Sequence, residues 1–571
     1  MKKPNTKRIL ENYFPISNWL PSYKKSFVRW DLVAGVTLAS FVLPESMAYA
    51  TLAGVPTYFG IYCCLAGGLL FALFTTSMQV AVGPTSSISL MVGSTVAVLS
   101  GGDPGRWAEI AGLTALAVAA ICFLAYIFKL SSVVNFISDS ILLGFKAGAA
   151  LSIMATQLPK IFGVEGGGSN FFTRIWTLIK NLPETNWTVL IFGVVAMIVL
   201  ITGEHLFKGK PVSLVVVIAA ILVMSFTHLA SAGVHITGVI PEGLPSLSRP
   251  SLRFRDVDGV LALAFACFLM GYIETISAAR TFAMKNNYTV NPRQELLSMG
   301  AANFAAAFSS AYVVAGGLSQ STVNDKSGAK TPMSLIICSV TLGLILMFFT
   351  GLLKNLPEVI LAVIVIHAVS GLIKIKELKR IRQLNRMEFI VALIAIAGVL
   401  VFGILKGVMI SVIMSLILLI RRTSSPEVAL LGRIGDSHNF SDRVRHPDNI
   451  LLPGIVIVRI ESSILYFNAE DIFEKINTYI TSSSTPVKLI ILDLSAAPYV
   501  DVAGSKMLLN LTTDYHKQGV SIRIVQALSG VRDILRKQGV EEMTGHIGRD
   551  KTIAEAVHEF NTTTLDADPR L

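Results

Sequence analysis

Residues 83–89 read GPTSSIS and residues 316–322 read GGLSQST, and both stretches interrupt long apolar segments. Each follows a short apolar piece, residues 79–82 and 311–315, that we expect to be extended. Small residues and hydroxyl groups stand where a helix would begin. Each stretch therefore predicts a broken helix, in which a short extended segment leads into a half-helix.

An acidic residue precedes each polar stretch. The separation in sequence between Glu45 and Glu274 is nearly the same as that between Ser86 and Ser319. The similar offset of two different features indicates an internal duplication of the chain. Paired broken helices in corresponding halves indicate a transporter's binding site near the middle of the membrane. The alternative is two unrelated polar breaks in a glycine-rich membrane protein.

The composition indicates a membrane protein. Of the 571 residues, 53% are apolar and 15% are charged, whereas soluble domains carry about 25% charged residues. Apolar stretches long enough to span a bilayer recur from residue 31 to residue 421. These features exclude a soluble enzyme, a disordered chain and a fibrous protein, and predict an α-helical polytopic membrane protein.

The apolar stretches predict about twelve to fourteen spans, two of them broken. The clear ones are residues 107–127, 132–156, 187–202, 212–231, 259–284, 332–353, 358–373 and 387–420, the last with a hairpin at Lys406-Gly407. Residues 31–100 are broken by proline and glycine and are expected to form several spans. An even number is favoured because both basic ends belong in the cytoplasm.

The net charge of +11 is concentrated in short basic segments. They contain Lys2, Lys3, Lys7, Arg8, Lys24, Lys25, Arg29, Lys374, Lys376, Lys379, Arg380, Arg382, Arg386, Arg421 and Arg422. Basic residues in short loops mark the cytoplasmic side of a membrane, so we expect cytoplasmic N- and C-termini and no nucleic-acid partner. The five cysteines lie in apolar stretches without a Cys-x-x-Cys pair, so we expect no disulfide, metal or cofactor. No signal peptide is expected.

The composition changes after Arg422. Residues 423–450 are polar and predict a linker. Further on, strands at 454–460, 487–494 and 520–525 are expected to alternate with helices at 469–480, 503–518 and 530–538. This alternation predicts a small cytoplasmic α/β domain. The predicted domains are an N-terminal cytoplasmic segment (1–30), a transmembrane domain (31–422), the linker (423–450) and the α/β domain (451–571).

A desolvated anion within a membrane needs hydrogen-bond donors and positive potential. The N-terminus of a half-helix supplies free backbone N–H groups and a dipole worth about half a positive charge. Hydroxyl donors and closely approachable backbone come from Ser86, Ser87, Ser319, Ser321, Gly316 and Gly317. The alternative is that these residues cap helices and fill space.

Glu274 is the strongest single candidate. An ionised carboxylate inside an apolar span costs about 3 kcal/mol or more, which favours a functional role and the protonated form. We expect Glu274 to carry a coupling proton, with Glu45 as a second acid near the same cavity. The alternative is a structural contact of Glu274 with Arg280 or a neighbouring hydroxyl group. Asp139 and Lys146 also fall in or near an apolar stretch, where they could reach the membrane surface, and they are assigned no role.

Several segments have a specific sequence. They are residues 18–23 (NWLPSY), 31–37 (DLVAGVT), 43–56 (LPESMAYATLAGVP), 271–280 (GYIETISAAR), 300–303 (GAAN), 317–331 (GLSQSTVNDKSGAKT) and 492–504 (LDLSAAPYVDVAG). These segments resemble the sulfate permease (SulP) anion transporters, a family that includes animal solute carrier anion exchangers and plant sulfate–proton symporters. The last segment resembles the core of the family's STAS domain. The resemblance covers nearly the whole chain.

The resemblance implies two inverted repeats of seven spans, a substrate site between the third and tenth spans, elevator-like alternating access and a homodimer. With the residue chemistry, it implies an anion site formed by Glu45, Tyr49, Thr85, Ser86, Ser87, Gly317, Leu318, Ser319 and Gln320. Many relatives have glutamine in place of Glu45, and animal exchangers have arginine in place of Gln320. Val502 and Ala503 follow Asp501 where anti-sigma antagonist relatives carry a phosphorylatable serine, so no phosphorylation switch is expected.

These observations predict a secondary active anion transporter of a bacterial inner membrane, not an enzyme. Because position 320 is not arginine and two acids are present, proton-coupled uptake of a dianion fits better than chloride exchange. We expect sulfate or a small dicarboxylate as the substrate, with a proton, or else sodium, as the coupling ion. The alternatives are a sodium- or proton-coupled bicarbonate carrier, an uncoupled anion channel, or a sensor that signals through the STAS domain.

Overall fold

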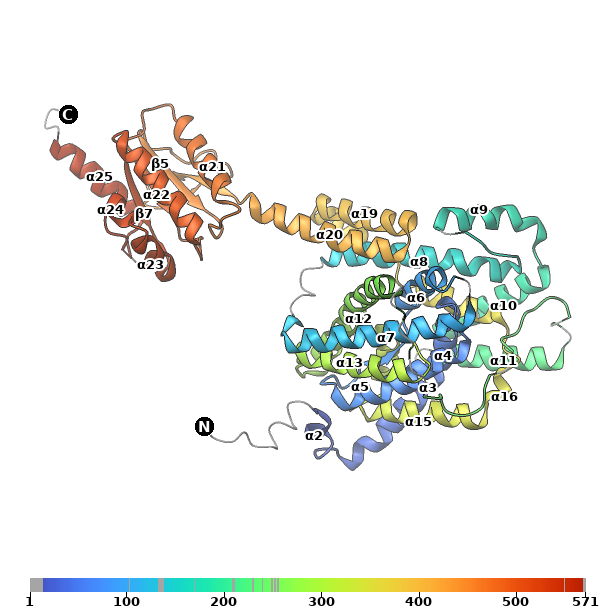
Figure 1. The fold of residues 1–571 in the computed structure, drawn as a ribbon. Helices are drawn as coiled ribbons and strands as arrows, with labels where there is room; N and C mark the ends of the chain where they lie inside the picture. Colours follow the sequence, from blue (N-terminus) through green and yellow to red (C-terminus); the bar gives the residue numbers. More distant parts are fainter. Residues whose placement is uncertain are drawn as a thin grey trace. The chain divides into compact units, whose positions relative to one another are not determined.

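A computed structural model describes residues 14–567 except 102, 132–137, 169, 208–210, 228, 230, 239, 248–249, 251–252, 254–255 and 549. The chain divides into two compact units, the first ending at Ser415 and the second beginning at Leu416 (Figure 1). The first unit is almost entirely helical, and the second combines a sheet with helices. The basic residues predicted at positions 2, 3, 7 and 8 lie outside the described residues.

The first unit contains helices and two very short strands. In chain order these are α2 (Ile16–Trp19), α3 (Lys25–Leu52), α4 (Thr57–Tyr62), a π-helix η1 (Cys63–Gly67), α5 (Gly68–Phe74), β1 (Ala81–Gly83), α6 (Ser86–Leu99), α7 (Pro104–Ile127), α8 (Asp139–Phe162), α9 (Phe171–Asn181), a 3-10 turn η3 (Leu182–Glu184), α10 (Trp187–Leu206) and α11 (Val212–Phe226). The second half contains α12 (Val257–Asn286), α13 (Pro292–Phe308), β2 (Ala315–Gly317), α14 (Leu318–Lys326), α15 (Met333–Phe348), α16 (Thr350–Leu353), α17 (Glu358–Ser370), α18 (Ile375–Leu384), α19 (Arg386–Phe402) and α20 (Ile404–Ser424).

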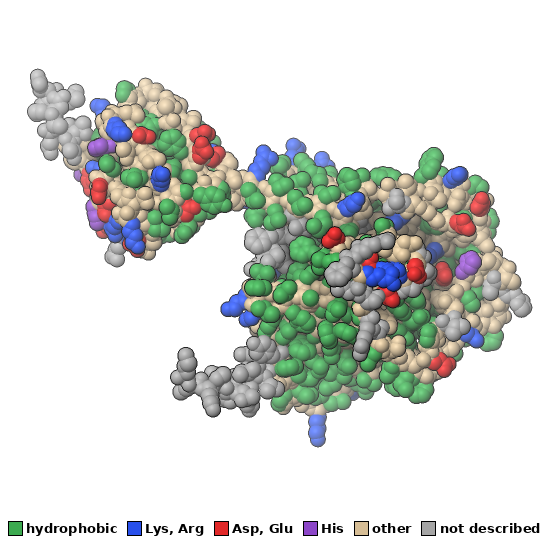
Figure 2. Space-filling view, in the orientation of Figure 1, with side chains coloured by type: hydrophobic (Ala, Val, Ile, Leu, Met, Phe, Trp, Pro, Cys, Tyr) green, Lys and Arg blue, Asp and Glu red, His purple; other side chains and the backbone are tan. Residues whose placement is uncertain are grey.

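Seven helical segments in the described part of the chain are long and apolar enough to span a membrane. Helices α6, α11 and α15 are shorter but also apolar. Figure 2 shows apolar side chains over much of the visible surface of this unit. Large exposed apolar side chains include Leu124, Ile191, Ile198, Leu222 and Phe226. Such a surface suits hydrocarbon, because in water it would expose a large apolar area without compensation.

Two span boundaries differ from the prediction. The predicted span 132–156 corresponds to α8, which ends at Phe162 because Gly163 follows with a left-handed φ of 64°. The break between α19 and α20 lies at Gly403, not at the predicted Lys406-Gly407 hairpin. Gly403 has a φ of 85°, a conformation that residues with a side chain rarely adopt. The prediction placed the break at a lysine and a glycine, whereas the backbone breaks three residues before that lysine, at the glycine with a positive φ.

The two predicted extended pieces pair with each other. β1 and β2 are antiparallel, with Ala81 opposite Gly317 and Gly83 opposite Ala315. Each strand leads directly into a half-helix, β1 into α6 and β2 into α14. Segments from the two halves of the helical sequence therefore form one small sheet at the centre of this unit. The predicted broken helices are confirmed, and the antiparallel pairing makes their two helices begin close to each other.

Side chains from α12 and α13 hold β2 in place. The Asn303 side chain accepts a hydrogen bond from the Val314 N–H (3.0 Å) and donates one to the Val314 carbonyl (2.9 Å). The Gly316 N–H donates to Thr275 Oγ1 over 2.8 Å. A Cβ on Gly316 would lie 3.0 Å from the Thr275 Cα, so this close approach requires glycine. These contacts give hydrogen-bond partners to the N–H and carbonyl groups of an extended segment, which lacks the internal hydrogen bonds of a helix and is buried away from water.

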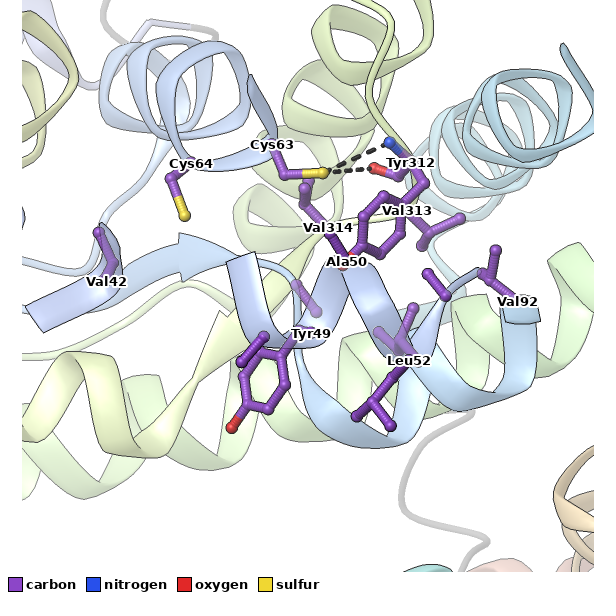
Figure 3. Close-up of a cluster of buried hydrophobic side chains, with 14 of the residues drawn as sticks. Val42, Tyr49, Ala50, Leu52, Cys63, Cys64, Val92, Tyr312, Val313 and Val314 are labelled. Carbon is purple, nitrogen blue, oxygen red and sulfur yellow. Dashed lines mark hydrogen bonds between the residues drawn. The ribbon is translucent and has the colours of Figure 1, made fainter. Parts of the chain in front are cut away.

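The buried core surrounds the broken helices. In Figure 3, Cys63 in the π-helix faces Tyr312, just before β2. The Cys63 thiol donates to the Tyr312 carbonyl (3.5 Å), and the Tyr312 N–H donates to the sulfur (3.4 Å). All five cysteines are buried and free. The irregular turn of η1 therefore fixes the chain that enters β2.

The second unit contains one mixed five-stranded sheet and five helices. The strands are β3 (Val428–Arg433), β4 (Phe440–Asp442), β5 (Ile455–Ile460), β6 (Leu489–Asp493) and β7 (Ser521–Val525), and their order in the sheet is β4-β3-β5-β6-β7. β5, β6 and β7 are parallel, whereas β3 is antiparallel to both β4 and β5. The helices are α21 (Ala469–Thr481), α22 (Val502–Lys517), α23 (Ser529–Lys537), α24 (Val540–Thr544) and α25 (Ile553–Ala567).

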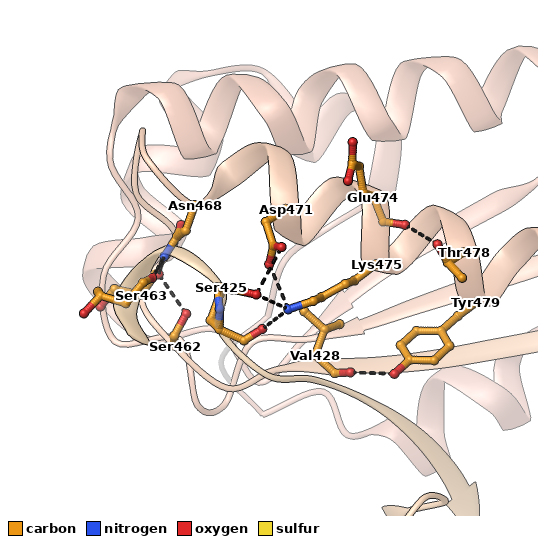
Figure 4. Close-up of polar contacts among 12 residues, drawn as sticks. Ser425, Val428, Ser462, Ser463, Asn468, Asp471, Glu474, Lys475, Thr478 and Tyr479 are labelled. Atoms are coloured by element: carbon orange, nitrogen blue, oxygen red, sulfur yellow. Dashed lines mark hydrogen bonds and ion pairs between the residues drawn. The ribbon is translucent and has the colours of Figure 1, made fainter. Parts of the chain in front are cut away.

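The predicted linker, residues 423–450, is largely structured. It contains β3 and β4, which extend the sheet beyond the three predicted strands. Contacts with α21 hold the start of β3, as Figure 4 shows. Lys475 Nζ donates to Ser425 Oγ (3.0 Å) and to the Pro426 carbonyl (2.8 Å), and the Tyr479 hydroxyl donates to the Val428 carbonyl (3.0 Å). These strands were missed because the residues around them are polar, although β3 itself is a short apolar run that is buried at Val428, Ala429, Leu431 and Gly432.

Candidate functional site

A cavity of about 280 Å³ lies within the helical unit. One wall comes from α3, α12 and the two broken helices, and the other comes from α8 and the end of α17. The lining residues are Glu45, Tyr49, Pro84, Thr85, Ser86, Leu142, Leu143, Lys146, Glu274, Ser277, Ala278, Gly317, Leu318, Ser319, Gln320, Ala368, Gly371, Leu372 and Lys374. The cavity is large enough for a small oxyanion and some water.

Both half-helices begin at this cavity without a side-chain cap. The N-cap residue of α6 is Thr85 and that of α14 is Gly317, and neither accepts a hydrogen bond from its helix through a side chain. By contrast, Asn186 and Asn291 cap α10 and α13 in this way. Uncapped first-turn N–H groups carry positive potential and bind anions well.

Glu45 connects α3 to the second broken helix. Its carboxylate is 4% exposed, and it accepts hydrogen bonds from the Tyr49 hydroxyl and from Gln320 Nε2, both over 3.1 Å. Gln320 Nε2 also lies 3.3 Å from the Pro84 carbonyl of the first broken helix. The glutamine that replaces an arginine of the animal exchangers therefore bridges an acid and both broken helices.

Glu274 connects α12 to the first broken helix. Its Oε1 accepts a hydrogen bond from Ser87 Oγ over 2.8 Å. Its Oε2 is buried and has no hydrogen-bond partner among the described residues. Of the two alternative structural contacts, the one with Arg280 is not formed, since no ion pair joins these two described side chains, whereas the one with a neighbouring hydroxyl group is formed by Ser87. A carboxyl group with one unpartnered oxygen can hold a proton there and donate it to an anion.

Most residues proposed from the sequence lie together. Glu45, Tyr49, Thr85, Ser86, Glu274, Gly317, Leu318, Ser319 and Gln320 all line the cavity. Ser87 does not line it, because its hydroxyl donates to Glu274. Ser321 is also turned into the protein, where it accepts from the Ala81 N–H (2.9 Å) and donates to the Gly317 carbonyl (2.6 Å). These two serines position the site's backbone and acid, whereas the sequence analysis made them anion donors.

The sequence analysis missed the cationic part of the lining. Lys146 on α8 and Lys374 after α17 both line the cavity, opposite the broken helices. Lys146 is half-buried within a long apolar helix and forms no ion pair with the described residues. The available signal was a lysine inside an apolar span, which was assigned no role, and the structure places it in the lining of the cavity. The side chain of Asp139 lies outside the described residues.

Metal chemistry finds no support in the part of the chain that the structure describes. No group of three histidine, cysteine or acidic side chains there could hold a metal ion. The cavity instead combines two uncapped helix ends, hydroxyl groups, two lysines and two acids within an apolar bundle. Broken helices around an intramembrane polar cavity define a polytopic membrane transporter.

Comparison with known protein families identifies the family to which this transporter belongs. The model of the Sulfate permease family matches residues 28–395, and the model of the STAS domain matches residues 446–559. The chain belongs to the sulfate permease family, which consists of transporters and not of enzymes. The resemblance found in the sequence and the C-terminal STAS domain are confirmed, and the protein is a multi-pass membrane protein.

Similar curated proteins extend along nearly the whole chain. One is the "Probable sulfate transporter Rv1739c" of Mycobacterium tuberculosis, which is 28% identical over 552 residues and covers 95% of this chain and 98% of its own. Another is the "Sulfate transporter 4.1, chloroplastic" of Arabidopsis thaliana, also 28% identical, which covers 94% of this chain and 81% of its own.

Similar solved structures agree on the fold. The murine Solute Carrier 26 family member A9 anion transporter in the inward-facing state has a TM-score of 0.89 and 22% identity, covering 98% of this chain and 96% of its own. The transmembrane domain of the cyanobacterium bicarbonate transporter BicA has a TM-score of 0.61 and 19% identity, covering 69% of this chain and 98% of its own. At these identities the likeness concerns the fold alone.

Proposed function

We propose that the protein is a secondary active transporter that takes up sulfate or a small dicarboxylate together with protons across a bacterial inner membrane. One observation carries this proposal: two uncapped helix N-termini and two acids, Glu45 and Glu274, line the same cavity. The helix ends attract an anion, and the acids give a means of adjusting the charge of the site.

The charge balance of the cavity supports proton coupling. Each helix N-terminus contributes about half a positive charge, and Lys146 and Lys374 contribute one each. If both acids are ionised, the lining offers about one positive charge, which does not offset a dianion. If both are protonated, it offers about three positive charges. The dianion therefore favours the protonated acids, and protonation favours the dianion, as linkage requires.

Glu274 is the principal proton carrier in this proposal, and Glu45 is the second. Glu274 has an unpartnered oxygen, whereas both oxygens of Glu45 accept hydrogen bonds. Tyr49, Thr85, Ser86, Ser319 and the first-turn N–H groups at Leu318 then hold the anion, while Gln320 orients Glu45. Ser87 acts indirectly, through its hydrogen bond to Glu274.

The order of elements supports two inverted repeats of seven spans. The first repeat runs through α3, α4–α5, β1–α6, α7, α8, α10 and α11, and the second through α12, α13, β2–α14, α15, α17, α19 and α20. Even the amphipathic helices α9 and α18 occupy matching places. With fourteen spans, the basic segments at Lys24 and at Arg421 lie on the same, cytoplasmic side.

Two sets of helices around the cavity support elevator-like movement. α3, α6, α12 and α14 carry the proposed anion and proton sites and pack with α7, α13 and α15. α8, α10, α17 and α19 form a second packed set, of which α8 and α17 supply the opposite wall. A displacement of the first set against the second would carry the bound anion across the membrane. The family resemblance further supports a homodimer, which cross-linking in membranes would detect.

The substrate assignment rests on relatives with full-length similarity that are named sulfate transporters. A bicarbonate carrier is the principal alternative, because backbone donors bind any compact oxyanion. The purified protein in proteoliposomes should take up labelled sulfate or fumarate saturably, faster at an external pH of about 6 than of about 8, and without sodium. Bicarbonate as the preferred anion, sodium dependence, or a conductance without saturation or counterflow would each overturn the proposal.

A further inference from the structure

A second cavity adjoins the candidate site. Its volume is about 420 Å³, and it shares Glu45, Leu318 and Ser319 with the first cavity. Its other wall comes from α10, α11 and α17 and includes Glu204 and His367. The cavity therefore lies between an acid of the candidate site and a second pair of titratable side chains.

Glu204 and His367 form a hydrogen-bonded pair between two membrane helices. His367 Nε2 lies 2.8 Å from Glu204 Oε2. The side chain of Glu204 is 42% exposed and that of His367 is 27% exposed, so the pair is open to the cavity rather than sealed between helices. Glutamate and histidine inside membrane spans are costly, and in transporters such residues commonly relay protons.

The pair lies near the predicted cytoplasmic face. Both residues belong to the last turn of their helices, α10 and α17. The basic helix α18 follows shortly after the end of α17, and basic segments mark the cytoplasmic side. A proton that reaches His367 is therefore close to the compartment into which a symporter must release it.

Few other titratable groups surround the pair. Glu45 from α3 is the remaining titratable group that lines this cavity among the described residues, while α11 and α14 contribute the hydroxyl groups of Ser213, Ser319 and Thr322. α8 packs against α10 and α17, and its Lys146 lines the first cavity. Its Lys160 lies 3.9 Å from Glu358, at the end of α17 opposite to His367. Lys374 follows α17 and lines the first cavity, and His205 lines a depression beside α10 that Glu204 also lines and that does not include His367. Glu45 is thus the proton donor that the cavity presents to His367.

We propose that the Glu204–His367 pair is the proton-binding site through which Glu45 releases its proton to the cytoplasm. This inference rests on the proposed proton-coupled transport. Because an ionised Glu204 only accepts hydrogen bonds, the neutral His367 donates through Nε2–H and keeps Nδ1 free. The O–H bond of the protonated Glu45 breaks, the proton moves through cavity water, and an N–H bond forms at Nδ1. The Glu204 carboxylate balances the resulting imidazolium until water on the cytoplasmic side takes the proton.

The test compares net uptake with exchange in proteoliposomes that contain the full-length protein. Net uptake of labelled sulfate driven by an inward proton gradient requires release of the proton inside, and an internal pH dye follows that release. Exchange of labelled for unlabelled sulfate at equal pH on both sides does not require it, because the proton can stay bound. The variants are His367→Gln and Glu204→Gln, and the matched control is His205→Gln, which changes a histidine that does not line this cavity.

We expect both variants at the pair to lose about tenfold or more of net uptake and internal acidification, while exchange changes less than about twofold. The control should retain both activities. Wild-type net uptake in both pair variants overturns the inference, and so does a parallel loss of exchange, which would make the pair a structural contact between α10 and α17. If the wild type itself takes up sulfate without protons, the proposed function fails instead, so the two failures are distinguishable.

Discussion

Replacing Glu274 by glutamine removes the charge of this side chain but keeps its size. Glutamine can still accept the hydrogen bond that Ser87 Oγ donates over 2.8 Å, so the local structure should persist. The glutamine side chain cannot ionise, so position 274 no longer has to bind a proton before a dianion enters the site. We therefore expect anion transport to continue with much weaker proton dependence.

The size of the cavity gives the magnitude of the effect. A sphere of about 280 Å³ has a radius of about 4 Å, so a bound anion would lie about 5 Å from the Glu274 carboxylate. At an effective dielectric constant of about 20, an ionised Glu274 repels a dianion by about 7 kcal/mol. Solvent in the cavity reduces this repulsion, and even about 3 kcal/mol weakens binding about 100-fold. Protonation of Glu274 removes that penalty.

The assay measures labelled sulfate uptake into proteoliposomes at a fixed internal pH and at external values from about 5.5 to about 8.5. Uptake by the wild type should rise steeply as the external pH falls, because the protonated site binds the dianion. In Glu274→Gln the profile should vary much less with pH. Ser87→Ala is the control, because it removes the donor but keeps the acid, and it should retain the proton dependence. A wild-type pH profile in Glu274→Gln would refute Glu274 as the proton carrier.

Three further predictions test other parts of the molecule. Lys146→Gln should raise the Kd for sulfate about tenfold, as measured by thermal shift, whereas Lys146→Arg, which keeps the charge, should bind normally. Gly316→Ala should destabilise the protein by about 1–3 kcal/mol and lower its Tm, because the new Cβ would lie 2.9 Å from a valine methyl carbon. Gly351→Ala, with nothing within 4 Å, should not. In the STAS domain, the pKa of Glu541 is lowered from its usual 4.5. The main cause is the hydrogen bond that the Ile547 N–H donates, and the positive charges of neighbouring side chains add to it. The resulting stabilisation is present above about pH 4.5 and is lost as the pH falls through the lowered value, so amide exchange at Ile547, corrected for its intrinsic pH dependence, should accelerate there.

Local sequence patterns predicted the elements that build the site. The broken helices at residues 83–89 and 316–322 and the two preceding acids could be recognised because glycine, hydroxyl residues and a carboxylate are rare inside apolar spans. The strands β5, β6 and β7 were also predicted, since β5 and β6 contain consecutive branched apolar residues and β7 alternates polar with apolar ones. Strand β3 was missed because its short apolar run lies in a polar stretch, and its apolar side chains find their partners only in the folded domain, on both faces of the sheet.

The direction of individual side chains could not be predicted in the same way. Ser86 lines the cavity, whereas the hydroxyl group of its neighbour Ser87 donates a hydrogen bond to Glu274, which belongs to α12. Lys146 was assigned no role because the sequence does not say which face of α8 meets α17 and the broken helices. The roles of the cavity residues in transport stay predictions until the variants are measured.

The sequence alone determined that the chain is a membrane protein of the sulfate permease family with a C-terminal STAS domain, because hydropathy and family motifs are properties of short segments. Only the tertiary structure decided that β1 pairs with β2 and that Lys146 and Lys374 line the same cavity as the two acids. The two strands come from different halves of the helical sequence, and so do the two acids, so the site depends on the helix packing that brings them together. Local patterns specify elements, whereas the charge balance of the cavity depends on the faces that those elements present to one another.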